Sequence, residues 1–403
     1  MVKLQVQCWR LILTLSLAVV VVACASTSNT ITVSPTLPST SAPIPTALAK
    51  QPAEPTKSIP CPLPQVGPPR ESRFDPLNGA GAIAYSNNGL WLVHPATDRT
   101  VQLHPGSDTA LVWSPDGNRI AFLSRLRPEP CAFAFLMLAD LRAGTIRPLL
   151  DRPGLYSRPA WSPDGSYLAY TESNGRLQIL RLSDNLVQVL SDDAYVSKVI
   201  DLRGDTVDVV PVAPRWVDGT HIAYLRSDGS GRMVGLAKLA LDGSERSMLV
   251  KDLVNPYDGF AFTPNGSRLA YARSDEGETP LVLVDLRSGE RLEIEENSSN
   301  QVRSPASRLQ WSPDGTYLVG GAGSAGIFLM EGDPPAYRVL QIKAFGVLGE
   351  AQSWAPDSRR FVILVEKGNN QLPGLAIYDL EHTTLSELAI ELRPPYTVAW
   401  NPK

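Results

Sequence analysis

The feature that most constrains this chain is a short motif that recurs seven times, an aromatic residue followed by a turn of the Ser-Pro-Asp-Gly type. The aromatic residues stand 43 to 55 residues apart. A repeat of this length is typical of one four-stranded blade of a β-propeller. The seven aromatic residues are Trp113, Trp161, Trp216, Phe262, Trp311, Trp354 and Trp400.

Each repeat has a consistent local chemistry. In Ser-Pro-Asp-Gly, the proline fits the second position of a type I turn and the glycine fits the fourth, so the chain is expected to reverse there. A short strand follows each turn, as in Ile120–Phe122 and Leu168–Tyr170. The aromatic residue before the turn is predicted to wedge between neighbouring sheets, where one aromatic side chain buries a large area. The repeat at Val217–Gly219 is one residue short, so its turn geometry is expected to differ.

The two ends of the repeat region complete one another. Residues 82–104 supply three strands, but no aromatic-turn strand precedes them, and Thr397–Pro402 reads as an inner strand with nothing after it. We predict that these segments form one sheet, so that the C-terminal strand pairs with the first blade and closes the ring without an open edge. The expected fold is all-β, a seven-bladed β-propeller over residues 78–403. An unrelated β-sandwich is the alternative.

These repeats resemble the TolB-like β-propeller family, which belongs to the WD-type (WD40-like) propellers. The segment Ala160-Trp161-Ser162-Pro163-Asp164-Gly165 shows the motif in full. The resemblance implies the fold but no particular activity, because similar blades occur in periplasmic scaffold proteins and in the substrate-gating domains of prolyl oligopeptidase-type enzymes. The sequence contains neither the α/β domain that precedes the propeller in TolB nor a hydrolase domain, so neither function is transferred whole.

The first 23 residues are interpreted as a signal peptide. Lys3 and Arg10 precede an apolar run, Leu11–Ala23, that is too short to span about 30 Å of hydrocarbon comfortably. The run ends in Val21-Val22-Ala23-Cys24, which resembles the bacterial lipobox and implies lipidation of Cys24 with cleavage in front of it. A lipoprotein held on the extracytoplasmic side of the bacterial cell envelope is therefore expected. A transmembrane anchor or an ordinary cleaved signal are the alternatives.

Residues 24–77 are predicted to form a disordered tether between the lipid and the propeller. They are rich in Ser, Thr, Pro and Ala and contain few large apolar residues, so they cannot bury a core. Without the signal peptide and Cys24, the chain keeps Cys61 and Cys131. A disulfide between them would tie the tether to the folded domain, and two unrelated free thiols are the alternative.

Several classes of function are disfavoured. A net charge of −4 provides no electrostatic footprint for nucleic acid. The four histidines are expected on different blades, which leaves no histidine metal site, and the recurrent Asp116, Asp164, Asp218 and Asp314 are expected to stabilise turns. Gly321–Gly326 matches the dinucleotide fingerprint, but Ile327–Met330 after it reads as a strand where the mechanism needs a helix, so no cofactor is expected. Arg203–Asp205, an adhesion tripeptide, is expected at the tip of a hairpin of Val199–Leu202 and Val207–Val210.

The predicted binding surface is the funnel formed by the loops that lead into the inner strands. Aromatic and arginine side chains there are typical anchors for a peptide or a glycan, and the alternative is that several of them only seal loops against the rim. We expect a non-catalytic module that binds or scaffolds a protein or cell-envelope polymer, with no catalytic residue identified and no oligomeric state fixed. The alternative is a hydrolase or lyase that acts on peptides or glycans at the funnel. The candidate funnel residues are Tyr156, Arg158, Tyr195, Lys198, Tyr257, Asp258, Arg303 and Tyr396.

Overall fold

The chain divides into two units, residues 1–58 and 59–403, and everything described below belongs to the second. The computed structural model describes residues 81–125, 133–200, 206–274, 280–294, 307–321, 327–332, 335–340, 346–348, 353–365, 371–394 and 397–403. Cys24, Cys61 and Cys131 lie outside these ranges, so the lipidation site and the candidate disulfide stay predictions.

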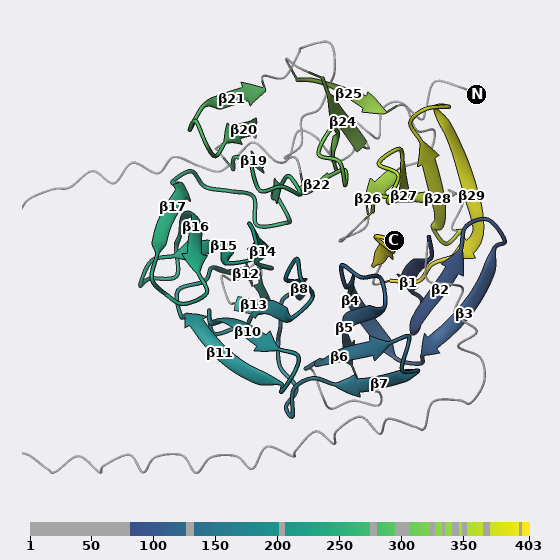
Figure 1. Ribbon diagram of the computed structural model, residues 1–403, viewed down its shortest axis with the longest axis horizontal. Helices are drawn as coiled ribbons and strands as arrows, with labels where there is room; N and C mark the ends of the chain where they lie inside the picture. Colours follow the sequence, from purple (N-terminus) through teal and green to yellow (C-terminus); the bar gives the residue numbers. More distant parts are fainter. Residues whose placement is uncertain are drawn as a thin grey trace, which may run out of the picture. The chain divides into compact units, whose positions relative to one another are not determined.

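Seven antiparallel sheets of four strands each stand around a common axis, which confirms the seven-bladed propeller (Figure 1). Named from the innermost strand outward, blade 1 contains β30 (Val398–Trp400), β1 (Ile83–Ser86), β2 (Leu90–His94) and β3 (Arg99–His104). Blade 2 contains β4 (Ser107–Trp113), β5 (Arg119–Arg125), β6 (Phe135–Asp140) and β7 (Thr145–Pro148). Blade 3 contains β8 (Ala160–Trp161), β9 (Tyr167–Thr171), β10 (Leu177–Arg181) and β11 (Leu186–Ser191).

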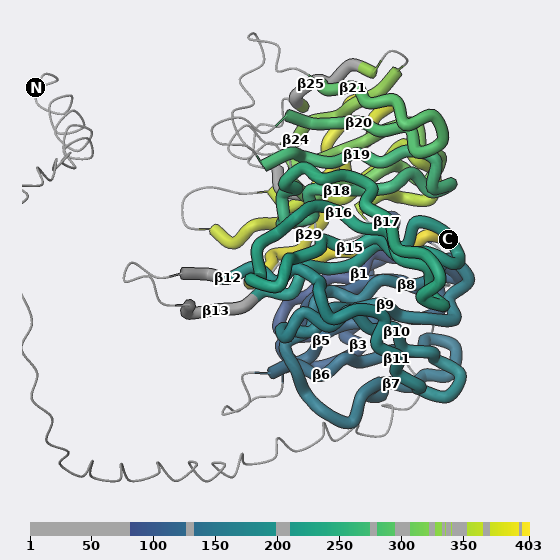
Figure 2. The backbone as a smooth tube through the Cα atoms, turned by 90° about the vertical axis from the view of Figure 1, so that its left-hand side faces the viewer, coloured from purple at the N-terminus to yellow at the C-terminus, as the bar shows by residue number. Residues whose placement is uncertain are grey.

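The other four blades repeat this arrangement, and Figure 2 shows the propeller from its edge. Blade 4 contains β14 (Arg215–Trp216), β15 (His221–Ser227), β16 (Met233–Ala240) and β17 (Arg246–Val250). Blade 5 contains β18 (Phe260–Phe262), β19 (Arg268–Ala272), β20 (Leu281–Asp285) and β21 (Arg291–Ile294). Blade 6 contains β22 (Ser307–Trp311), β23 (Leu318–Gly321), β24 (Ile327–Glu331) and β25 (Ala336–Leu340), and blade 7 contains β26 (Gly346–Leu348), β27 (Arg360–Val365), β28 (Gly374–Asp379) and β29 (Thr384–Glu391).

The ring closes as the sequence predicts, with the C-terminal strand inside the first blade. Strand β30 pairs with β1 in antiparallel register, Ile83 opposite Trp400. Beyond the strand, the backbone N–H of Gly81 donates to the carbonyl of Lys403 at 2.7 Å, and that of Asn401 donates to Ala82 at 2.9 Å. The first blade therefore has its innermost strand supplied from the other end of the chain, which leaves no open edge at the seam.

The aromatic residues of the repeats lie between blades, as predicted, and most of them also make a hydrogen bond across the junction. Among the described residues, five of the six indole N–H groups of the repeats donate to a backbone carbonyl of the preceding blade at 3.0 to 3.3 Å. The donor and acceptor pairs are Trp113 and Ala399, Trp161 and Val112, Trp216 and Ala160, Trp311 and Ala261, and Trp354 and Gln310. The Phe262 ring has no N–H group, and the buried Nε1 of Trp400 has no partner in the described part of the chain.

The turns after the aromatic residues have the predicted geometry. The N–H of Gly117 donates to the carbonyl of Ser114 at 2.9 Å, and the glycine has a φ of 68°, a conformation that favours glycine. Asp116 accepts a hydrogen bond from the N–H of Asn118 at 3.2 Å. Burial by itself would raise the pKa of Asp116, but hydrogen bonds from Asn118 and Ser114 outweigh it and lower that pKa to about 2. The aspartate of this motif is therefore structural, as expected.

The long interval between Trp161 and Trp216 contains an extra hairpin, β12 (Val196–Ile200) paired with β13 (Thr206–Pro211). Its base is attached to blade 4 where Ala194 pairs with Arg226 and the N–H of Tyr195 donates to Leu225 at 2.7 Å. The adhesion tripeptide, residues 203–205, lies outside the described ranges.

Two further expectations concern histidines and helices. The expectation that all four histidines occupy different blades is wrong, because His94 on β2 and His104 on β3 both belong to blade 1. Residues Ile327–Glu331 form strand β24, which confirms that no helix follows the glycine-rich segment before it. In the described ranges, no helix is long and apolar enough to cross a membrane.

Candidate functional site

A cavity of about 270 Å³ is lined mostly by residues of the innermost strands. We call it the axial cavity. The innermost strands of blades 2, 3, 4 and 6 contribute to it, together with the segment that leads into blade 5. Its lining residues are Val112, Pro115, Arg158, Pro159, Ala160, Trp161, Arg215, Trp216, Asp258, Arg308, Leu309 and Gln310.

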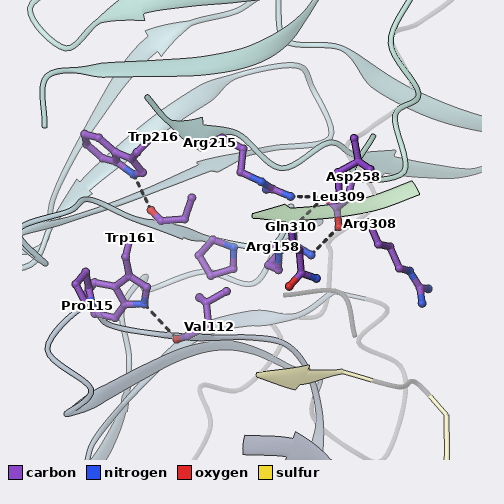
Figure 3. Close-up of a pocket in the computed structure, with 12 residues that line it drawn as sticks. Val112, Pro115, Arg158, Trp161, Arg215, Trp216, Asp258, Arg308, Leu309 and Gln310 are labelled. Atoms are coloured by element: carbon purple, nitrogen blue, oxygen red, sulfur yellow. Dashed lines mark hydrogen bonds and ion pairs between the residues drawn. The ribbon is translucent and has the colours of Figure 1, made fainter. Parts of the chain in front are cut away.

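The two ends of the axial cavity differ in chemistry (Figure 3). Arg158, Arg215 and Asp258 meet at one end, which we call the arginine end, and Arg308 lies beside them with its guanidinium group directed away from Asp258. The Trp161 and Trp216 side chains lie toward the other end, where the indole N–H of each donates to the backbone of the preceding blade. The cavity therefore has a cationic end and a largely apolar end.

The loop Asn255–Gly259 holds Asp258 in place. The buried side chain of Asn255 accepts a hydrogen bond from the N–H of Tyr257 at 2.9 Å, and its carbonyl accepts one from Gly259 at 3.1 Å. A Cβ at Gly259 would lie 2.5 Å from the Asn255 backbone oxygen, so the turn requires glycine there. The backbone carbonyl of Asp258 accepts a hydrogen bond from the N–H of Leu309 at 3.0 Å, and this bond joins the loop to blade 6.

Proline residues restrict the backbone beside both arginines that reach Asp258. Arg158 precedes Pro159, and a residue before proline is confined to an extended conformation. Arg215 follows Pro214 and opens strand β14, opposite Ala223. The Arg215 guanidinium also lies 5.7 Å from the centroid of the Phe260 ring, within the range of a cation–π contact.

The three side chains form a compact ionic cluster. Arg158 binds Asp258 through two parallel hydrogen bonds, Nη1 to Oδ2 at 2.7 Å and Nη2 to Oδ1 at 2.8 Å. Arg215 Nη2 donates to Oδ1 of the same carboxylate at 2.5 Å. The side chains are 10% (Arg158), 18% (Asp258) and 22% (Arg215) exposed. Two guanidinium groups thus share one carboxylate in a partly desolvated site.

Burial and charge both affect the ionisation of this cluster. Burial by itself would raise the pKa of Asp258, but the charges of Arg158 and Arg215 outweigh it, so the pKa lies below its usual value. Burial, followed by the like charge of Arg158, lowers the pKa of Arg215 despite the attraction of Asp258. The carboxylate is therefore held in its ionised form, and the positive charge on Arg215 is not fully compensated.

The predicted funnel residues separate into three groups. Arg158 and Asp258 meet directly and line the axial cavity. Tyr156, Tyr195, Lys198 and Tyr257 are not among the lining residues: Tyr156 is buried and donates to the carbonyl of Arg152, whereas Tyr257 is 63% exposed next to Asp258 in the chain. Arg303 and Tyr396 lie outside the described residues. Their roles in binding stay predictions.

The sequence reasoning did not identify Arg215, Arg308 and Gln310, which also line the cavity. A signal for them is present in the repeats. Positions one and three before a repeat aromatic recur among the lining residues, although the backbone there is not a regular strand, since Arg308 has a φ of 54° and the pairing of β22 with β23 is irregular beside it. Arg215 and Gln310 occupy the first of these positions, and Arg158 and Arg308 occupy the second.

Within the described ranges, no group of three or more His, Cys, Asp or Glu side chains is arranged to hold a metal ion. The axial cavity itself contributes a single carboxylate, Asp258. What this arrangement offers chemically is a set of guanidinium donors, two of which already pair with the one carboxylate.

Comparisons with known proteins find similarity in structure but not in sequence. No family model matches this chain, and no curated protein does either. An oligogalacturonate lyase from Vibrio parahaemolyticus is similar over 78% of this chain and 93% of its own, with 14% identity and a TM-score of 0.53. A Bacteroides uniformis protein provisionally described as a 6-phosphogluconolactonase covers 79% of this chain and 99% of its own, with 16% identity and a TM-score of 0.52.

TolB from Acinetobacter baumannii is also among the similar structures. It covers 80% of this chain and 67% of its own, with 16% identity and a TM-score of 0.48. The similar structures thus include propellers of the TolB type and propellers with enzyme names. At these identities the similarity shows the fold, and it assigns no activity to this chain.

Proposed function

We propose that this protein is a lipid-anchored, extracytoplasmic binding module that takes up part of a protein or cell-envelope polymer at its axial cavity without catalysing a reaction. The apolar run Leu11–Ala23 and the lipobox-like residues that end at Cys24 support the anchor and the compartment. Two or three acyl chains on one cysteine would hold the protein stably on a membrane.

The observation that carries the binding role is the cluster of Arg158, Arg215 and Asp258 in the axial cavity. Aspartate in general acid or base catalysis needs a pKa near the working pH. The two arginines instead lower the pKa of Asp258, which makes its carboxylate a poor proton donor. The cluster therefore suits the positioning of an anionic ligand better than proton transfer.

The alternative is a hydrolase or a lyase that acts on peptides or glycans. The similarity to an oligogalacturonate lyase gives one substrate class to test, an acidic oligosaccharide. Arginines can also stabilise a negative charge that develops during a reaction. The two functions differ in a simple observation, because an enzyme releases an altered product and a binding module returns its ligand unchanged.

Site-specific photo-crosslinking in the producing bacterium tests the binding role. Tyr257 is replaced by p-benzoylphenylalanine, since its side chain is 63% exposed and adjoins Asp258. The matched control carries the same probe at Leu385 on the outermost strand of blade 7. We expect a defined crosslinked species at position 257 that is absent at position 385 and that disappears when Arg308→Gln is added.

Turnover measurements provide the opposing outcome. The full purified chain is incubated with oligogalacturonate and with peptides, and the products are followed by mass spectrometry. Product formation that is lost in Arg308→Gln would contradict the non-catalytic proposal, as would the absence of any crosslink specific to position 257.

The anchor is tested separately. Cells are grown with radioactive palmitate, and the protein is recovered from membrane and soluble fractions. We expect label on the wild-type chain in the membrane fraction, and no label on Cys24→Ala. A Cys24→Ala variant that is still labelled, or a wild-type chain that is never labelled, would contradict the lipid anchor.

A further inference from the structure

The outermost strand of blade 3 differs in composition from the outermost strands of the other blades. Strand β11 lies at the outer rim of the ring, and within the described residues it pairs only with β10 (Figure 1). The outermost strand of each other blade contains at least one Arg or Glu residue, whereas β11 contains no charged residue and no proline. Charged side chains and proline are common means by which an edge strand avoids pairing with another chain. Strand β11 lacks both.

The side chains of β11 are apolar and exposed. Leu186 is 56% exposed, Val187 is 37% exposed and Val189 is 50% exposed. The register with β10 is regular over Leu186–Val189 and shifts only between Val189 and Ser191, so the bulge lies at the end of the strand. Because side chains alternate along a strand, the exposed apolar residues occupy both faces of it. The strand therefore offers a regular edge with apolar side chains above and below.

The sequence of this edge is a palindrome. Residues 186–190 read Leu-Val-Gln-Val-Leu in either direction, with Gln188 at the centre. In a two-fold symmetric interface the same patch must be complementary to itself. Antiparallel pairing of two copies about Gln188 meets this condition, because it places glutamine opposite glutamine, valine opposite valine and leucine opposite leucine. Directly opposite side chains of this kind are what stabilises an antiparallel pair.

The charges beside the strand also match in this register. The exposed Asp192 of one copy would lie level with Asp184 of the other. Two guanidinium groups lie at that corner: Arg181 Nη2 donates to Asp184 Oδ2 at 2.6 Å, and Arg147 Nη1 donates to Asn185 Oδ1 at 3.3 Å. Each end of the pairing would thus combine two arginines with two carboxylates, so the charges balance.

We propose that β11 binds the β11 strand of a second copy of this chain, edge to edge and antiparallel, with the two-fold axis at Gln188. The two four-stranded sheets of blade 3 would then continue as one sheet across the dimer. This interface goes beyond the proposed binding function, since it lies at the outer rim and the axial cavity is lined mostly by inner strands.

The area of the interface sets the expected affinity. Stable protein interfaces bury about 1,200 to 2,000 Å² in total, and pairing of two five-residue strands supplies less than that. We therefore expect a reversible dimer with a Kd on the order of 10 µM.

The first experiment measures the sedimentation velocity of the full chain in detergent from about 1 to 100 µM, a range that brackets this Kd. We expect the sedimentation coefficient of the wild-type chain to rise with concentration. Gln188→Lys should stay monomeric, because it places two like charges opposite each other on the edge. The matched control is Leu292→Lys on β21, since Leu292 is 43% exposed on another outermost strand. It should dimerise as the wild type does, and thermal unfolding checks that each variant is folded.

A mixture of two variants tests the position of the two-fold axis. Gln188→Glu alone should be monomeric for the same reason as Gln188→Lys. Mixing the two should restore the dimer, because residue 188 of one copy faces residue 188 of the other and the charges are then opposite. This rescue is specific to an axis at Gln188, and a defect in folding would not be reversed by mixing.

Oxidative crosslinking provides a second measure of the register. Opposite Cα atoms in antiparallel strands are about 4.5 to 5.5 Å apart, which is within the range of a disulfide. Gln188→Cys should therefore give a covalent dimer on oxidation. Leu186→Cys is the matched control and should not, since the two copies of that position are offset by four residues, about 14 Å. The wild-type chain gives the background from Cys61 and Cys131.

Four results would overturn the inference. A wild-type chain that stays monomeric throughout the concentration range excludes the dimer. Undiminished dimerisation of Gln188→Lys moves the interface away from β11, and a mixture with Gln188→Glu that stays monomeric excludes the two-fold axis at this residue. A monomer in which the Gln188→Cys thiol resists alkylation would assign the edge to another segment of this same chain.

Discussion

Ile83 and Trp400 lie opposite one another in antiparallel strands, although 316 residues separate them in the sequence. The pair joins β1 to β30 and thereby completes the first blade. Both residues belong to one buried cluster with Tyr85, Val362 and Val398, so the seam also packs blade 1 against blade 7. The closing strand is only three residues long, which concentrates the stability of the seam in few side chains.

The substitution Trp400→Ala is expected to lower the free energy of unfolding by about 3 to 5 kcal/mol, the usual cost of truncating a buried aromatic residue. Trp400 is 2% exposed, so little of this cost is relieved by solvent. Chemical unfolding followed by tryptophan fluorescence and circular dichroism measures it. Leu385→Ala on the outermost strand of blade 7 is the control and should change stability by less than about 0.5 kcal/mol. A Trp400→Ala loss of no more than the control would contradict closure through this residue.

Two tryptophan substitutions separate the indole hydrogen bond from the packing. Trp161 Nε1 donates to Val112 at 3.1 Å, whereas the buried Nε1 of Trp400 has no partner in the described residues. An arginine guanidinium lies over each ring, Arg119 over Trp161 and Arg360 over Trp400. Trp161→Phe is therefore expected to cost about 1 kcal/mol more than Trp400→Phe, since only the first loses a hydrogen bond.

The outcome of this comparison is measured by unfolding of both variants under the same conditions. Equal losses would show that the blade junctions depend on aromatic packing alone. A larger loss for Trp400→Phe would mean that its indole N–H has a partner in the native protein.

Replacing Asp258 tests the ionic cluster of the axial cavity. Asp258→Asn removes the carboxylate charge that Arg158 and Arg215 share and leaves two guanidinium groups beside each other. Removal of one partner from a buried ionic arrangement usually costs about 3 to 5 kcal/mol. The double variant Asp258→Asn with Arg215→Gln should recover part of that loss, because it removes one of the two guanidinium groups that then repel each other.

Asp184→Asn is the matched control for this prediction. Its ion pair with Arg181 is exposed on both sides, so the substitution should leave unfolding unchanged within error. If Asp258→Asn is as stable as the wild-type chain, the cluster has no structural role. The charge of Asp258 would then not be required to hold Arg158 and Arg215 next to each other.

The turn aspartates predict how stability depends on pH. Hydrogen bonds from Asn118 and Ser114 outweigh burial and lower the pKa of Asp116 to about 2 from the ordinary 3.8. Because the folded pKa is the lower one, the unfolded chain binds more protons between these values, so stability falls as the pH falls through this window. The difference in unfolding free energy between wild type and Asp116→Asn should be constant above about pH 4 and shrink toward pH 2. A difference independent of pH would contradict this account.

The fold could be predicted because its information is local and repeated. The spacing of Trp113, Trp161 and their counterparts gives the blade period, and the turn at Ser114–Gly117 gives the point of reversal. Even the long-range closure followed from counting, since Thr397–Trp400 lacked a blade and residues 82–104 lacked an inner strand. The local pattern could not predict the indole hydrogen bonds. These bonds depend on how far each blade is shifted along the propeller axis relative to the preceding blade.

The candidate site could be predicted less completely. Arg158 and Asp258 were predicted from their loops. Arg215 and Arg308 lie in inner strands, where only the repeat aromatic residues were assigned a role, that of packing between sheets. Their meeting at one end of the cavity depends on which blades face each other across the axis. That is a property of the closed ring. Tyr156, another residue predicted from a loop, is buried and donates to the carbonyl of Arg152, which fits the alternative that such a residue seals its loop.

Gly320 links the packing of blade 6 to the axial cavity. It lies opposite Phe328 in the pairing of β23 with β24. A Cβ at Gly320 would lie 2.4 Å from Cε1 of Phe328 and 2.7 Å from Cδ2 of Leu309, both closer than real contacts allow. Leu309 in turn lines the cavity beside Arg308. The phenylalanine ring therefore occupies the space that a side chain at position 320 would need.

We expect Gly320→Ala to cost about 1 to 3 kcal/mol, the range for overpacking a filled core. Phe328→Leu should relieve part of the clash, so the double variant is expected to be more stable than the sum of the two single changes. Gly219→Ala is the control, because a Cβ there meets nothing within 4 Å. Since Leu309 lines the axial cavity, Gly320→Ala should also weaken the crosslink formed from position 257, while Gly219→Ala leaves it unchanged. A fall in stability without any change in that crosslink would show that Leu309 does not form the ligand-facing wall.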